Sequence, residues 1–147
     1  MKTFHITKLT KSGKKILAIP FLRMKERVLG KRYDCSLVIA GDAYTQKLNR
    51  IYRKRGYIPN VLSFPLEQKS GEIILNVRQA KRECTARGES LRFFVALLFI
   101  HSLLHLKGHR HGGIMERQER VLLSLFHIPA CADNAGRKNT SRPKKMI

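Results

Sequence analysis

Acidic residues are scarce in this chain. Its 147 residues include 10 Asp and Glu against 30 Lys and Arg, which gives a formal net charge of +20. Such an excess attracts polyanions, and phosphate backbones are the commonest polyanions in cells. An anionic membrane surface is the rival partner, but the sequence has no amphipathic anchor that would insert into one. The charge therefore favours a nucleic-acid partner over small neutral substrates and over membranes.

Cysteine is also rare. Cys35, Cys84 and Cys131 are odd in number, far apart and form no C-x-x-C pair. This pattern argues against a disulfide framework and against a thiolate zinc site. It fits a reducing compartment, so we expect a cytoplasmic protein.

Long hydrophobic runs are missing as well. The most apolar segment, residues 91–106, carries Arg92, His101 and His105. A membrane-spanning helix needs about 20 apolar residues, and ionisable groups at its centre are costly. We therefore expect a buried core helix here and no membrane partner.

The length suits one domain. Residues 1–130 carry alternating apolar patterns and are predicted to form a single domain. Residues 131–147 are polar and rich in Lys and Arg, which predicts a flexible basic tail.

The pattern predicts strands at residues 2–9, 36–40, 61–64 and 72–76, the third of them stopped by Pro65. Helices are predicted at residues 20–29, 42–52, 78–86, 91–107 and 113–126. Strands and helices intermix without strict alternation, so the expected fold class is α+β, a small mixed β-sheet packed with helices.

Three histidines form the most informative pattern in the sequence. His101 and His105 are four residues apart on a predicted helix, so both rings lie on one face, about 6 Å apart along the axis. Gly108 then ends the helix and allows a turn that brings His111 back toward them. Three imidazoles leave one tetrahedral position for water, as in catalytic zinc sites, although iron, copper and nickel also accept imidazole.

The same spacing occurs in metzincin proteases, which carry H-E-x-x-H-x-x-G-x-x-H. Those enzymes use the glutamate as general base, but here Ser102 follows His101. Peptide hydrolysis by that mechanism is therefore not expected.

The stretch from His101 to His111 reads HSLLHLKGHRH, and LNRIYR and NVLSFP precede it in the chain. In matching order, these motifs resemble the YbeY family of bacterial metal-dependent endoribonucleases, whose pattern H-G-x-L-H-L-x-G-Y-D-H corresponds to the histidine stretch. The pattern L-N-x-x-Y-R followed by N-V-L-S-F-P corresponds to LNRIYR at residues 48–53 and NVLSFP at residues 60–65. Gly71-Glu72 and an M-x-x-x-E pair, Met115 and Glu119, also match. The resemblance covers roughly residues 35–128.

This resemblance implies a zincin-like hydrolase fold and one Zn²⁺ per chain, held by His101, His105 and His111. It implies an essential arginine near the metal, at Arg53. It also implies cleavage of single-stranded RNA, maturation of the 3′ end of 16S ribosomal RNA, and ribosome quality control at the small ribosomal subunit.

The chain departs from the family pattern at two places. His109-Arg110 replaces the family's Tyr-Asp before the third histidine, which removes a carboxylate that could orient a ligand or handle protons. Pro59 stands where the family often has Thr. These changes leave the ligands intact but bear on catalysis.

The remaining site assignments are hypotheses about catalysis and RNA binding. Arg53 could clamp a phosphate oxygen bidentately. Glu72 and His109 are the candidate general bases, and either metal-bound water or the RNA 2′-hydroxyl could be the nucleophile. Basic residues interleaved with tyrosines, which can track a backbone and stack bases, are candidate RNA contacts: Arg50, Tyr52, Lys54, Arg55 and Tyr57.

Three functions remain open from the sequence. They are a zinc-dependent RNA endonuclease, a metal hydrolase with another substrate, and a non-catalytic RNA-binding ribosome-assembly protein that contains zinc. Arg53 and the three-histidine set favour the first, whereas the carboxylate missing at Arg110 favours the third.

Overall fold

The structure is a computed structural model that describes residues 3–130. The predicted tail, residues 131–147, lies outside the described residues. The strands are β1 (Phe4–Lys8), β2 (Asp34–Ala40), β3 (Val61–Glu67) and β4 (Ser70–Asn76). A 3₁₀ helix, η1, spans Lys14–Ala18, and the α-helices are α1 (Phe21–Leu29), α2 (Asp42–Arg53), α3 (Val77–Arg87), α4 (Leu91–Lys107) and α5 (Gly113–Leu125).

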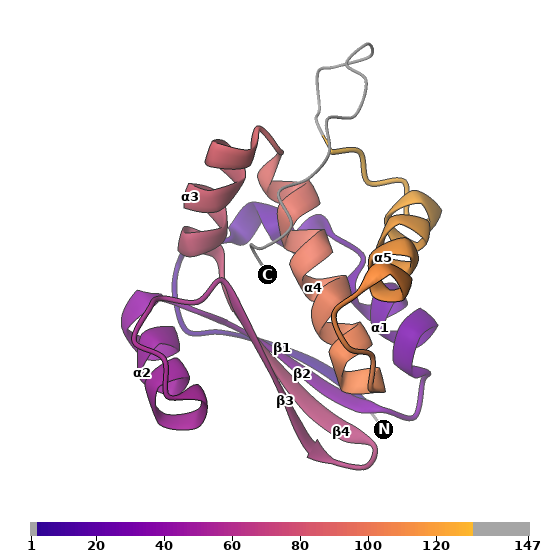
Figure 1. Cartoon of the computed structure of the whole chain (residues 1–147), viewed down its shortest axis with the longest axis horizontal. Coiled ribbons are helices and arrows are strands. Elements are labelled where there is room, and N and C mark those ends of the chain that lie inside the picture. The colour runs from indigo at the N-terminus through magenta and orange to yellow at the C-terminus, as the bar shows by residue number, and fades with distance from the viewer. Residues whose placement is uncertain (1–2, 131–147) are drawn as a thin grey trace.

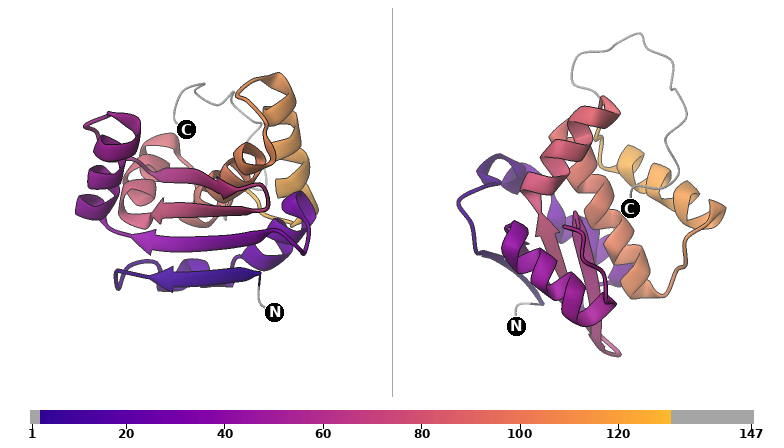
Figure 2. Two further views of the ribbon diagram at one scale, coloured as in Figure 1. Left: turned by 90° about the horizontal axis from the view of Figure 1, so that it is seen from below. Right: turned by 60° about the vertical axis from the view of Figure 1, so that its left-hand side comes forward.

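The four strands form one mixed sheet in the order β1-β2-β4-β3. β1 and β4 both run parallel to β2, whereas β3 is antiparallel to β4. Figure 2 (left) shows the strands side by side, with β1 at one edge. The predicted α+β class with a small mixed sheet is confirmed.

The helices cover the two faces of the sheet unequally. Figure 1 shows α2 on one side of the strands and the other α-helices on the opposite side. The main core lies on that crowded side, where inward residues of β2 and β4 pack with α4. A smaller cluster of Ala40, Leu62 and Ile74 packs with Leu48 of α2 on the other face. Only strand residues whose side chains point to the α4 face of the sheet can therefore face a site near α4.

Two elements differ from the sequence-based expectation. β3 continues through Pro65 to Glu67, with a register shift between Pro65 and Glu67. The predicted stop at Pro65 is wrong because β3 is an edge strand, where a residue without an N–H is tolerated. The η1 turn was not predicted.

The apolar helix predicted at residues 91–107 is α4, which contacts α1, α3, α5, β3 and β4. Ser90 caps its start by accepting a hydrogen bond from the Phe93 N–H at 3.1 Å. Among residues 3–130, no single helix is long and apolar enough to cross a membrane, and only α3 and α4 taken together across their 115° bend meet that test.

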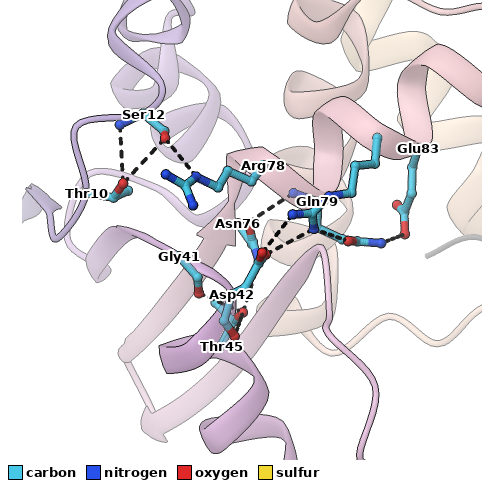
Figure 3. Close-up of polar contacts among 10 residues, drawn as sticks. Thr10, Ser12, Gly41, Asp42, Thr45, Asn76, Arg78, Gln79 and Glu83 are labelled. Atoms are coloured by element: carbon cyan, nitrogen blue, oxygen red, sulfur yellow. Dashed lines mark hydrogen bonds and ion pairs between the residues drawn. The ribbon is translucent and has the colours of Figure 1, made fainter.

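A polar network joins α2 to α3 at one end of the sheet (Figure 3). The buried Asn76 side chain accepts from the Gln79 N–H at 3.0 Å, which caps α3. Its Nδ2 donates to Asp42 Oδ1 at 2.9 Å and to Thr45 Oγ1 at 3.0 Å. Hydrogen bonds from Arg82, and then from Asn76, hold the pKa of the Asp42 carboxyl below its usual value. The network therefore fixes the start of α2 relative to the sheet.

Replacing Asn76 with Ala should lower the free energy of unfolding by about 1–3 kcal/mol, because buried partners lose their hydrogen bonds. Denaturant unfolding measures the change. The more exposed Arg82→Ala change is the comparison and should cost less. An Asn76→Ala protein as stable as wild type would contradict this role for the network.

Candidate metal centre and its cavity

Two of the three predicted metal ligands lie one turn apart at the C-terminal end of α4. His101 is buried and His105 is half-buried. Their Nε2 atoms are 2.9 Å apart, and their ring centroids are 4.5 Å apart. The i, i+4 spacing therefore brings both rings to one point, as the helical periodicity requires.

The chain then turns at Gly108, whose φ of 108° lies in the left-handed region. The N–H groups of Gly108 and His109 return to the carbonyls of His105 and Leu104, at 2.9 Å each, and close the helix end. This turn brings the His111 ring within 4.8 Å of the His101 ring and 4.5 Å of the His105 ring, measured between centroids.

The outer nitrogens of the two helical rings have acceptors. His101 Nδ1 lies 2.8 Å from Glu119 Oε1, and His105 Nδ1 lies 3.1 Å from the His109 carbonyl oxygen. A carboxylate and a carbonyl can only accept, so each Nδ1 carries the proton. Each Nε2 then presents a lone pair to the other at 2.9 Å. Two facing lone pairs at this distance repel each other unless a cation or proton lies between them.

The environment keeps the ligands in their metal-binding form. Burial, followed by the neighbouring His101 and His111, lowers the pKa of His105 to about 4. Burial, followed by His101, also lowers the pKa of His111. Neutral imidazole is the form that binds metals. The donor set therefore fits a metal ion, and ligand atoms of His101, His105 and His111 all lie within 4.8 Å of one another.

The cysteines take no part in this cluster. Cys35 and Cys84 are free and buried, and burial raises the pKa of the Cys35 thiol to about 12. Cys131 lies outside the described residues.

The histidines open into a cavity of about 330 Å³ between α4, β3 and the end of α2. Its residues are Arg53, Tyr57, Val61, Ser63, Pro65, His101, Ser102, His105, Leu106 and His111. Arg53 is close enough to contribute to the lowered pKa of both His105 and His111. A cationic side chain and three metal-binding imidazoles therefore share one space.

The loop after α2 is shaped by side chains of α2. The buried Asn49 donates through Nδ2 to the Tyr57 carbonyl at 3.0 Å, and Gln46 Nε2 donates to the Gly56 carbonyl at 2.8 Å. Lys54 adopts a left-handed φ of 57°. The loop thereby folds back and brings Tyr57 to the cavity beside Arg53.

The other predicted site residues lie elsewhere. Arg50, Tyr52, Lys54 and Arg55 are exposed and do not line the cavity. Glu72 lies on the sheet face opposite α4, because side chains alternate along a strand and Ile73 belongs to the core on the α4 side. Glu72 therefore does not face the histidines, and His109 contributes its backbone carbonyl to His105.

The sequence motifs assign no role to Glu119 or Asn49. Glu119 enters only as part of the M-x-x-x-E match, but its helical spacing from Met115, Leu122 and Leu123 already places it on the buried face of α5. Asn49 offered no comparable signal, since its role depends on the path of the loop.

The sequence of the chain matches a known protein family. The family model for endoribonuclease YbeY matches residues 3–126. The chain belongs to the YbeY family. The YbeY endoribonuclease of Campylobacter jejuni strain 81-176 is 35% identical over 117 residues, covering 74% of this chain and 87% of that protein. That of Helicobacter pylori strain J99 is 35% identical over 109 residues, covering 69% and 77%.

A solved structure shares the fold. The solution structure of TM1509 from Thermotoga maritima superposes with a TM-score of 0.63 at 19% identity, covering 91% of this chain and 99% of that one. The resemblance drawn from the sequence motifs to the YbeY family and its zincin-like fold is thus confirmed.

Protein purified without a histidine tag should carry about one divalent ion per chain, because three converging imidazoles make one site. Elemental analysis measures the content and identifies the metal. His105→Ala should lose the ion, whereas His5→Ala, on the exposed β1, should retain it. Full metal content in His105→Ala would show that the ion binds elsewhere.

Proposed function

We propose that this protein is a zinc-dependent endoribonuclease that cleaves single-stranded RNA. The observation that carries the proposal is that Arg53 and the three imidazoles line the same cavity. Support also comes from its YbeY relatives, which are described as endoribonucleases, and from the net charge of +20.

A phosphodiester is anionic, so its cleavage needs positive charge placed where the transition state gains negative charge. Arg53 supplies such charge, and its planar guanidinium can hold two phosphate oxygens at once. An ion held by His101, His105 and His111 would act as a Lewis acid and lower the pKa of a bound water.

The surface around the cavity suits a flexible polyanion. Tyr52 and Tyr57 are 66% and 59% exposed, so both rings are available for base stacking. Arg50, Lys54 and Arg55 are exposed beside them and can contact phosphates. We assign the RNA-binding surface to these five residues.

The biological setting is part of the same proposal. We propose that the substrate is ribosomal RNA, that the reaction matures the 3′ end of 16S RNA in the cytosol, and that the small ribosomal subunit is the partner. The family resemblance and the excess of basic residues support this assignment. We also propose that residues 1–130 form the catalytic domain.

Incubating the metal-loaded full chain with a single-stranded RNA oligonucleotide should yield internal cleavage. His105→Ala and chelator-treated wild type should not cleave, because the site has lost its ion. The product ends identify the nucleophile, since attack by the 2′-hydroxyl leaves a cyclic phosphate and attack by water does not.

A second candidate function predicts a different result from the same assay. Arg110 is exposed beside the third histidine, where the family motif has Asp, so a carboxylate is missing near the site. A non-catalytic RNA-binding protein would retain the RNA on a gel without cutting it. Metal-loaded wild type that binds but does not cleave would therefore overturn the endoribonuclease proposal.

Replacing Arg53 with Lys should reduce cleavage by at least about tenfold with metal content unchanged, because ammonium cannot reproduce the bidentate contact. The matched control is Arg92→Lys, since Arg92 is exposed at the opposite end of α4. Single-turnover cleavage rates and elemental analysis measure the two quantities. An Arg53→Lys protein that cleaves at the wild-type rate would remove Arg53 from the reaction.

A further inference from the structure

Glu119 is an acidic side chain in the interface between α4 and α5. It is only 4% exposed and shares the inward face of α5 with Met115, Leu122 and Leu123. Burying a carboxylate is costly unless it is hydrogen-bonded. Its position opposite His101 Nδ1, at 2.8 Å, provides that hydrogen bond.

The contact determines which ring nitrogen of His101 carries the proton. A carboxylate accepts, so Nδ1 must hold the ring proton, and Nε2 is left with its lone pair. That lone pair points toward His105 Nε2, which is 2.9 Å away. It therefore faces the three-histidine cluster that would hold the proposed ion. Without the carboxylate, the proton could move to Nε2 and block one ligand position.

The two helical histidines are supported differently. His105 is held by the backbone carbonyl of His109, which no substitution at that position removes. His101 is held by a side chain from a helix that begins after the turn. Packing of α5 against α4 therefore sets the orientation of one ligand.

We infer that Glu119 is a positioning residue, which locks the tautomer and ring orientation of His101 and thereby tightens metal binding. The inference rests on the proposed metal site and adds a residue to it. Carboxylates that hydrogen-bond a histidine ligand typically change metal affinity by about 10–100-fold when removed. A purely structural ion pair between α4 and α5 would change stability without changing affinity.

The test compares two glutamates on the same helix. Glu119→Gln keeps the size but replaces the carboxylate by an amide, which can accept from or donate to His101 Nδ1 and so no longer dictates the tautomer. Glu116→Gln removes the same charge from an exposed position on α5. Competition with a chromophoric chelator measures the Zn²⁺ affinity of each full-length protein. We expect affinity about 10–100-fold weaker in Glu119→Gln and unchanged in Glu116→Gln.

A second readout is independent of the ion. Long-range ¹H–¹⁵N spectra of metal-free protein report which nitrogen of His101 carries the proton. Wild type should show the proton on Nδ1, and Glu119→Gln should show a mixture of tautomers. Glu119→Asp, which keeps a carboxylate that can only accept, should retain the Nδ1 tautomer in part and lose less affinity than Glu119→Gln. If Glu119→Gln does not fold, Glu119→Asp should still bind Zn²⁺ more weakly than wild type.

The outcomes separate this inference from the proposed function. Wild-type affinity in Glu119→Gln, or equal weakening in Glu116→Gln, would overturn the positioning role while leaving the metal site intact. Wild type that binds Zn²⁺ no better than His105→Ala would instead overturn the metal site. The tautomer of His101 would still show whether Glu119 controls that ring.

Discussion

The burial of α4 is the constraint on which the rest of the structure depends. Its residues from Phe93 to Leu104 are all buried, and it contacts α1, α3 and α5 as well as β3 and β4. A helix covered all round cannot rotate without moving apolar surface into water or into its neighbours. His101 and His105 therefore occupy fixed positions.

The clustering of the three histidines could be predicted from sequence because their relationship is local. Helical periodicity fixes the relative placement of His101 and His105, and Gly108 provides the turn that returns His111. Glu72 shows the limit of this reasoning. Whether its side chain points toward the histidines depends on which face of the sheet packs against α4. The alternation of residues along a strand does not reveal which face that is.

The rest of the site depends on tertiary placement. Arg53 ends α2, whose first turn is tied to the start of α3 through Asn76. Asn49 then holds the following loop at the Tyr57 carbonyl. A motif comparison can name Arg53, but the distance between α2 and α4 follows from how both helices cover the sheet. Pro65 is a similar case, because its tolerance in β3 depends on an edge position that only the strand order reveals.

All three imidazoles come from residues 101–111, a single short stretch of chain. A cross-link that closes a short loop restricts few conformations of the unfolded chain, so it adds little to folding cooperativity. The sheet and its helices are assembled from residues far outside this stretch. The architecture therefore does not depend on an ion at the three imidazoles, and a chain in which these histidines are replaced should still fold.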